Sequence, residues 1–334
     1  MRQNRLFWLL VLVLFINLAL RVYSYRGEYS SRYDPDYWKD RYLRSQWVVS
    51  DSQESIGDDG LYAYAGWEYV HGRDPTTLNA EMPPLGKYFV GLSILVFGNQ
   101  SLFALLSGLL VLWAFFRLNL IVFKNKFMAL LPVVLFSFEP LFWQQLRAPY
   151  LDLLYLLFLL LTFIFFLRQR FFLAAFFLGF MAATKASAST FPLLGLTTIL
   201  YLVFRKNWFL LKQWLFLLPI SLASFALSYF RYFSLGHSLK QFLGVQKWTL
   251  AFYQTGAKAA LGSVWPMLAT GKWYTWWSEP VKVAEWQLTW PLLLIISLVF
   301  LISNFLKKKF DHFWNIYYLS DTLESLWLIN IFVW

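Results

Sequence analysis

The chain has 334 residues, of which 59% are apolar, 22% aromatic and only 14% charged, and its formal net charge is +11. Soluble domains carry about a quarter charged residues, so this composition excludes an ordinary soluble enzyme and a disordered chain. The absence of Cys excludes disulfides and thiolate sites, and three His leave little for a His-rich metal centre. The high apolar and low charged fractions predict an all-α polytopic membrane protein.

The first apolar run extends from Leu6 to Val22, behind Arg2 and Arg5. A cleavable signal peptide is the alternative interpretation, but no small-x-small cleavage site follows. We therefore expect an uncleaved first helix that enters the membrane from the cytoplasm. Further spans are expected at residues 101–123, 127–143, 150–167, 171–185, 190–204, 213–233 and 288–305, about eight in all. The apolar stretch 313–334 would add a partial ninth span.

Alternation of these spans places the basic clusters on one side of the membrane. They are Arg2/Arg5, Lys124/Lys126, Arg168/Arg170, Arg205/Lys206/Lys212 and Lys307/Lys308/Lys309. This is the pattern of cytoplasmic loops under the positive-inside rule. Eleven of the 18 acidic residues instead lie between Glu28 and Glu81. The placement of charge thus argues against nucleic-acid binding and for a multi-pass protein of the plasma (inner) membrane with a cytoplasmic N-terminus, although an endoplasmic reticulum location fits the same topology.

The spans divide the chain into three parts. Residues 1–235 form a transmembrane module that includes a long first extracytoplasmic loop, 23–100. Residues 236–287 form a second extracytoplasmic loop rich in Trp and Lys, which either covers a site at the outer surface or rests on the membrane. Residues 288–334 hold the C-terminal span or spans, and the apolar ending leaves open whether the chain is truncated at Trp334.

Two short helices are expected in the first loop. Apolar residues recur at helical spacing over 59–71, which predicts an amphipathic helix on the membrane surface with Asp58 at its start. Asp58 is either the N-cap of that helix, which the local pattern favours, or a general base. Pro83-Pro84 precedes a second interfacial helix at 85–97. Lys87 on that helix is either a snorkelling side chain or a phosphate ligand.

The order Asp58-Asp59, Tyr62, Gly72 and Pro83-Pro84-Leu85 resembles the first extracytoplasmic loop of GT-C class membrane glycosyltransferases. It is similar in particular to the protein O-mannosyltransferase and lipid A aminoarabinose transferase families. Their pattern is an Asp-Glu pair, a following Tyr and a later Pro-Pro-Leu, and the mannosyltransferase version reads His-Pro-Pro-Leu-Gly-Lys. This chain departs from it with Asp59 in place of the Glu and Met82 in place of the His.

Two further segments resemble the same families. Leu146 to Asp152 is similar to their Ser-Arg-x-x-x-Leu-Asp signature, and Gly179 to Lys185 is similar to their Gly…Thr-Lys stretch. The resemblance covers roughly residues 1–235. Ionisable residues beside a span are costly and are functional candidates by default, which supports a role for Arg147, Asp152 and Lys185. The alternative for the first two is an Arg147–Asp152 pair that merely joins two helices.

The resemblance implies an inverting transferase that moves a sugar from a polyprenyl-phosphate donor to a protein or glycolipid acceptor in the bilayer. It implies catalytic roles for Asp58 and Asp59, with Asp58 as the general base. The substrate-binding residues that it implies are Tyr62, Lys87, Arg147, Asp152 and Lys185, and the three cations among them would hold the leaving phosphate. We expect no required cofactor and no metal ligands, although divalent-metal assistance through the acidic pair stays open.

Two functions from other classes compete with the transferase. A transporter needs polar residues or broken helices near the middle of the bundle, whereas these spans are almost purely apolar. A non-catalytic membrane assembly protein would share the hydropathy but would not need the acidic pair. His71 and His237 are isolated in the sequence and are expected to be surface residues, and Glu139 is expected to face the interior of the bundle.

Overall fold

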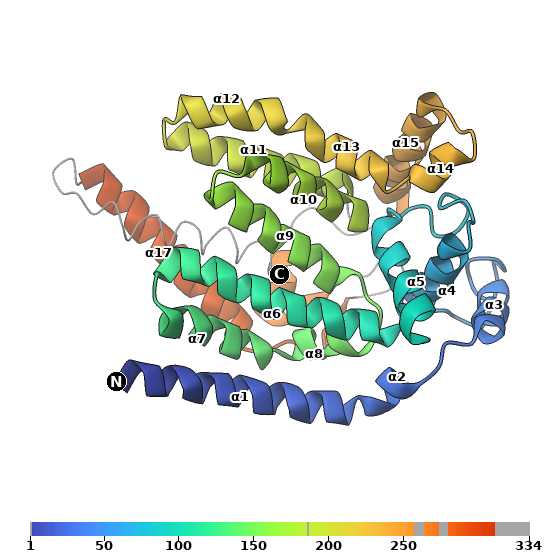
Figure 1. Cartoon of the computed structure of the whole chain (residues 1–334), viewed down its shortest axis with the longest axis horizontal. Coiled ribbons are helices and arrows are strands. Elements are labelled where there is room, and N and C mark those ends of the chain that lie inside the picture. The colour runs from blue at the N-terminus through green and yellow to red at the C-terminus, as the bar shows by residue number, and fades with distance from the viewer. Residues whose placement is uncertain (1, 186, 257–263, 274–279, 311–334) are drawn as a thin grey trace.

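Long apolar helices form the body of the protein and lie side by side along its longest axis (Figure 1). The computed structural model describes residues 2–185, 187–256, 264–273 and 280–310, and about 75% of the chain is helical. The helices of the body are α1 (Arg2–Ser24), α6 (Ser101–Phe123), α7 (Lys126–Ser137), α8 (Pro140–Arg147), α9 (Asp152–Leu167), α10 (Phe171–Thr184), α11 (Ser187–Phe204), α12 (Trp208–Leu217) and α13 (Pro219–Leu227). The expectation of a helical fold is confirmed.

The core of the body lies around α9 and α10, which pack against each other. α6 also contacts α9, while α11 and α13 contact α10. Leu159, Leu178 and Trp214 are almost wholly buried in this core. Gly179 lets α10 approach α13 closely, because a Cβ at this position would lie 2.9 Å from the carbonyl carbon of Ser221. The glycine of the Gly179–Lys185 motif therefore has a packing role.

Three helical segments are long and apolar enough to cross a membrane: Asn4–Ser24, Ser101–Phe123 and Trp208–Leu227. α7 and α8 form a fourth candidate if the bent pair counts as one span. α9 and α10 have 16 and 14 residues, so they are about 24 and 21 Å long, shorter than a hydrocarbon core of about 30 Å. The described residues thus contain apolar helices typical of a membrane protein, and the count of about eight spans stays a prediction.

The apolar run from 127 to 143 is not the continuous helix that its hydropathy predicted. α7 ends at Ser137 and α8 begins at Pro140, and the two helices are bent by 68°. Proline disfavours the helical conformation of the residue before it, and Glu139 is accordingly extended. The Glu139 carboxylate accepts a hydrogen bond of 2.7 Å from the indole of Trp290. The span expected at 127–143 therefore stays a prediction, and the helix within it is broken at Phe138 and Glu139.

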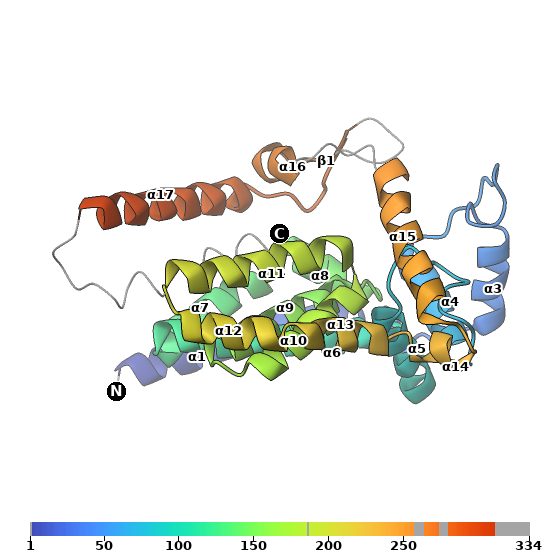
Figure 2. The ribbon, with the colours of Figure 1, turned by 90° about the horizontal axis from the view of Figure 1, so that it is seen from above.

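The first loop folds into helices that gather at one end of the body (Figures 1 and 2). They are α2 (Arg26–Ser30), α3 (Pro35–Leu43), α4 (Asp58–Val70) and α5 (Leu85–Phe97), and α14 (Phe230–Ser234) and α15 (Leu239–Gly256) lie at the same end. The stretch 213–233 was predicted as one span, but it includes parts of three helices, α12, α13 and α14. The apolar segment long enough to cross a membrane runs instead from Trp208 to Leu227. We call this end of the molecule the loop end.

α4 and α5 occupy the positions predicted for two short helices, but α4 is not an amphipathic surface helix. Its side chains are buried on most sides, including Leu61, Tyr62, Tyr64 and Tyr69, because α3 and α5 both pack against it. The small residues in its sequence therefore serve helix packing rather than an exposed polar face. α5 ends at Gly98, whose φ of +67° is the left-handed conformation typical of a glycine cap.

The basic clusters and the acidic loop lie at opposite ends of the body. The N-terminus and the α6–α7 and α11–α12 turns lie away from the loop end (Figure 1). α9 begins and α10 ends near the first loop, so the turn that joins them lies away from it as well. The N-terminus and these turns carry four of the five basic clusters, which agrees with the predicted alternation, and the fifth lies near the end of α17. Which end faces the cytoplasm stays a prediction.

The other described elements belong to the C-terminal part of the chain. α16 (Val264–Thr270) is followed by β1 (Lys272–Trp273), which pairs antiparallel with β2 (Val281–Lys282). α17 (Thr289–Phe310) covers the span predicted at 288–305 and lies with α16 on one side of the body (Figure 2). The partial ninth span predicted at 313–334 lies outside the described residues.

The crossing of α4 and α5 leads to a stability prediction. A Cβ added at Gly91 would overlap the carbonyl oxygen of Gly66 and lie 2.7 Å from its carbonyl carbon. Backbone atoms cannot rotate aside, so Gly91→Ala is expected to lower the free energy of unfolding by about 1–3 kcal/mol. A Cβ at Gly244 meets nothing within 4 Å, so Gly244→Ala is the matched control, and its helix propensity makes it neutral or stabilising. Thermal unfolding in detergent measures both; equal melting temperatures would contradict the close crossing.

Candidate functional site

Asp58 is the first residue of α4, and Gly57 is the N-cap. The interpretation of Asp58 as the N-cap is therefore wrong, although its charge still lies where a helix N-terminus favours an anion. The Tyr62 hydroxyl, one turn further along α4, donates a hydrogen bond of 3.3 Å to Oδ2 of Asp58. This hydrogen bond orients the carboxyl group from the protein side. Asp58 is exposed on its other side, so an incoming molecule can reach it.

Two further predicted residues lie close to Asp58. Asp152 begins α9 and Lys185 is the C-cap of α10. The Lys185 ammonium donates a hydrogen bond of 2.7 Å to Oδ1 of Asp152, an ion pair between residues 33 apart in the sequence. Both charges act on the Asp58 carboxyl group through space. The ends of three helices thus bring the Asp58, Asp152 and Lys185 side chains close together at the loop end. We call this group of three residues the Asp58 recess.

The surroundings of Asp58 raise the pKa of its carboxyl group. Desolvation by the surrounding protein is the largest cause, and the nearby Asp152 carboxylate adds to it. The Lys185 ammonium and the hydrogen bond from Tyr62 act in the opposite direction. Burial also raises the pKa of the Tyr62 phenol, so this hydroxyl remains a hydrogen-bond donor. A carboxylate with a raised pKa is a better proton acceptor near neutral pH than an ordinary surface Asp.

Two tyrosines near this recess were not predicted. Tyr150 lies in the short linker before α9, within electrostatic range of Asp58, Asp59, Arg147 and Asp152. Tyr253 lies on α15, in the second loop, and its hydroxyl contacts Sδ of Met82 at 3.2 Å. Tyr150 sits inside the Leu146–Asp152 motif and could have been noted there. No local pattern marks Tyr253, because its proximity depends on how the second loop packs on the first.

Lys87 lies in a different environment from the one predicted. Its side chain is completely buried. The ammonium donates hydrogen bonds to the carbonyl oxygens of Asn79 and Met82, at 2.7 and 2.8 Å, and to Oδ1 of Asn79 at 3.1 Å. An ammonium has three hydrogens to donate, so none remains for a phosphate. Burial lowers the pKa of Lys87 and raises that of nearby Glu81. The three hydrogen bonds of Lys87 attach α5 to the loop at 79–82.

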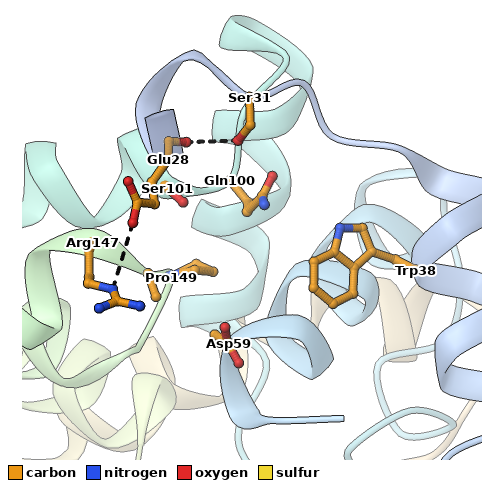
Figure 3. A pocket seen from close by; sticks show the side chains of 9 residues that line it. Glu28, Ser31, Trp38, Asp59, Gln100, Ser101, Arg147 and Pro149 are labelled. Atoms are coloured by element: carbon orange, nitrogen blue, oxygen red, sulfur yellow. Dashed lines mark hydrogen bonds and ion pairs between the residues drawn. The ribbon is translucent and has the colours of Figure 1, made fainter. Parts of the chain in front are cut away.

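Asp59 and Arg147 line a pocket at the loop end. A pocket of about 160 Å³ lies between the first turn of α4, the linker after α8 and the start of α6 (Figure 3). We call it the Trp38 pocket, and its lining residues are Glu28, Ser31, Trp38, Asp59, Gln100, Ser101, Arg147, Ala148 and Pro149. The side chains of adjacent residues on a helix point about 100° apart. Asp59 therefore faces the Trp38 pocket, whereas Asp58 faces Asp152 and Lys185. The structure therefore divides the predicted acidic pair.

The ion pairs also differ from those considered for Arg147. Its Nε lies 3.9 Å from Oε1 of Glu28, at the end of α2, and both side chains are substantially exposed. Asp152 pairs with Lys185 instead. The Arg147–Asp152 pair is thus wrong, and Arg147 is available at the Trp38 pocket rather than in the Asp58 recess.

His237 is not an isolated surface residue. Its Nε2 lies 2.8 Å from Oδ2 of Asp74 in the first loop, and its ring stacks on Tyr232. Nearby, Arg231 donates a hydrogen bond of 2.7 Å to the carbonyl oxygen of Gly72. The segment before α15 is therefore attached to the first loop at two places. His71 is exposed, as expected, with Nδ1 2.7 Å from the Trp67 carbonyl oxygen.

Comparison with known proteins identifies no relative of this chain. No protein-family model, no curated protein and no solved structure matches this chain. Among the residues that the structure describes, no three His, Asp or Glu side chains converge in an arrangement that could hold a metal ion.

Proposed function

We propose that the chain is an inverting glycosyltransferase that moves a sugar from a polyprenyl-phosphate donor to an acceptor hydroxyl at the extracytoplasmic surface of a membrane. The observation that carries this proposal is the Asp58 recess, in which a carboxyl group with a raised pKa lies within electrostatic range of the Lys185 ammonium, which is itself paired with Asp152. The recess is built from the three segments whose motifs resemble GT-C class transferases. The body of apolar helices offers a suitable surface for a polyprenyl tail.

The proposed step is a single displacement at the anomeric carbon. The oxygen of the acceptor hydroxyl bonds to that carbon while the Asp58 carboxylate accepts the hydroxyl proton. The bond from the carbon to the phosphate oxygen breaks on the opposite face, and its electron pair leaves with the phosphate. The Lys185 ammonium stabilises that departing negative charge. Asp152 holds Lys185 in position, and Tyr62 holds Asp58.

The site residues have unequal support in this proposal. Lys185 is the preferred phosphate ligand, because Lys87 donates all its hydrogens to the loop at 79–82. Arg147 and Asp59 line the Trp38 pocket, so in this proposal they bind substrate there rather than in the Asp58 recess. Tyr253 of α15 packs on Met82 beside the recess, which supports a covering role for part of the second loop.

The charges around Asp58 predict opposite pH effects for two conservative variants. Asp58 acts only when deprotonated, so transfer should fall as the pH drops through its pKa. Tyr62→Phe removes a hydrogen bond to the charged Asp58 carboxylate, so the pKa of Asp58 rises. The fall of the transfer rate at acid pH, the acid limb of the rate–pH profile, then moves to higher pH. Asp152→Asn removes a neighbouring negative charge, so the pKa falls and the limb moves to lower pH. Rate–pH profiles measure both; shifts in the same direction would contradict the assignment of the limb to Asp58.

Binding of the leaving group tests the donor class. Purified protein in nanodiscs is expected to bind undecaprenyl or dolichyl phosphate more tightly than the matching alcohol, as measured by native mass spectrometry. Lys185→Met should weaken binding of the phosphate at least about tenfold, since a charged hydrogen bond is worth about 1.5–3 kcal/mol. Lys212→Met, an exposed lysine of α12, is the control. Equal affinities for phosphate and alcohol would refute the proposed donor.

The alternative functions fit the structure less well. A transporter usually has ionisable residues inside its helical bundle. Among the described residues, the fully buried charged side chains are Glu81 and Lys87, and both lie at the loop end. The broken helix at Glu139 is the feature that most favours transport. An assembly protein would show no dependence of any activity on Asp58.

A further inference from the structure

The Trp38 pocket has the chemistry of a small polar binding site. Figure 3 shows Trp38 on one side, Glu28 with Arg147 on the other, and Asp59 below and between them. A volume of about 160 Å³ is smaller than the roughly 300–1,000 Å³ of drug-sized sites. The pocket therefore suits one compact polar group rather than a lipid tail or an extended peptide.

The polar atoms of the pocket include one without a partner. The buried Oε1 of Gln100 accepts no hydrogen bond in the described part of the chain. Buried polar atoms are nearly always paired, and rotation of the Gln100 amide toward the pocket would let a ligand with a hydrogen-bond donor pair this oxygen. The carboxylates of Glu28 and Asp59 are further acceptors, and Arg147 is a donor. The serine hydroxyls, the Gln100 amide nitrogen and the Trp38 indole are further donors, so the pocket offers both kinds of partner, and its two carboxylates outnumber its one guanidinium.

The charges of this pocket disfavour a phosphate or another anion. Two carboxylates line it with one guanidinium, and Arg147 already faces Glu28 at 3.9 Å. A neutral ligand with several hydroxyl groups fits the wall better, because each hydroxyl can donate to a carboxylate or amide oxygen and accept from Arg147. The indole of Trp38 adds a flat apolar face against which the C–H groups of a sugar ring can pack. Trp38 is held in place against α4, where a Cβ on Gly60 would overlap its ring.

We propose that the Trp38 pocket binds one sugar ring of the acceptor. This rests on the proposed transferase function and deepens it, because it makes the acceptor a glycan or glycolipid rather than a bare Ser or Thr side chain. Asp59 in the pocket and Asp58 in the neighbouring recess are consecutive residues of α4. Tyr150 lies within electrostatic range of both and of Arg147. A ring in the pocket would contact Asp59, the residue next to the proposed base on α4.

Binding of simple glycosides tests the pocket without requiring transfer. Saturation-transfer NMR on the full chain in nanodiscs would compare the methyl glycosides of mannose, glucose and N-acetylglucosamine with glycerol and the hexapeptide Ala-Ala-Ser-Thr-Ala-Ala. We expect saturable binding of at least one glycoside. Gln100→Leu and Trp38→Leu should weaken it at least tenfold. Gln53→Leu and Trp47→Leu, on exposed side chains of the first loop, should leave it unchanged.

Each other outcome overturns the proposal. Glycoside binding no stronger than that of glycerol, binding unchanged in Gln100→Leu, or hexapeptide binding that Gln100→Leu abolishes would do so. Thermal unfolding checks that each variant is folded, and Gln100→Leu carries the test if Trp38→Leu is not. Binding that persists in Asp58→Asn separates the two proposals: a chain that binds glycosides but transfers no sugar retains the pocket and loses the proposed activity.

Discussion

Asp58→Asn is expected to lower the rate of sugar transfer by about 10²–10⁴-fold, the usual contribution of a general base. The amide has the size of the carboxyl group but cannot accept the acceptor's proton. The loss should appear in kcat at saturating donor, because Lys185 and Asp152 still form their ion pair and hold the donor site. The measurement is the initial rate of transfer of radiolabelled sugar in proteoliposomes.

The control for this variant is Asp36→Asn, on the exposed side of α3. It removes an acidic residue from the same loop and should leave transfer unchanged. The melting temperature of Asp58→Asn should fall only slightly, since a charge at an exposed helix N-terminus contributes about 0.3–1 kcal/mol. A folded Asp58→Asn protein that retains more than about a tenth of the activity would show that Asp58 is not the base.

Lys87→Met is expected to lower the free energy of unfolding by at least about 2 kcal/mol, because it leaves the Met82 carbonyl oxygen and Oδ1 of Asn79 without the ammonium that donates to them. Met keeps much of the apolar stem, so the loss reports mainly on the ammonium. Thermal unfolding followed by Trp fluorescence in detergent provides the measurement. Lys39→Met removes an exposed ammonium from α3 and should change the melting temperature little.

The outcome distinguishes two roles for Lys87. A structural anchor predicts lower stability and weaker transfer that follows from disorder of the loop at 79–82. A phosphate ligand predicts unchanged stability together with weaker binding of undecaprenyl phosphate. The second result would restore the sequence-based role of Lys87 and contradict the buried position of its side chain.

Hydropathy located the helices well because long apolar runs have few other stable forms in a membrane protein. α1, α6 and α17 coincide closely with the runs at 6–22, 101–123 and 288–305. The break between α7 and α8 was missed because the apolar run continues through it. Pro140 was the available signal, and the preceding Glu139 marks the same point. The number of spans could not follow from helix positions, since short helices such as α10 need not cross a bilayer.

The candidate site was only partly predictable. Asp58, Asp152 and Lys185 stand at the starts or ends of apolar runs, and alternation of those runs placed them at one end of the molecule. The partners of these charges depend on tertiary packing: Arg147 faces Glu28 from a distant part of the chain. Burial of Lys87 was equally hidden, because a Lys behind Pro-Pro on a short helix looks like a surface residue. Tyr253 could be found only from the fold.

Transfer by the purified chain is the most direct test of the proposed function. The purified chain, reconstituted in liposomes, would be given polyprenyl-phosphate mannose, glucose or aminoarabinose in turn, with lipid and protein acceptors counted separately. The proposed function predicts transfer from one of these donors, with inversion at the anomeric carbon, that depends on Asp58 and Lys185. A folded protein that binds polyprenyl phosphate but transfers no sugar from any donor, or transfers it equally well without Asp58, would contradict it.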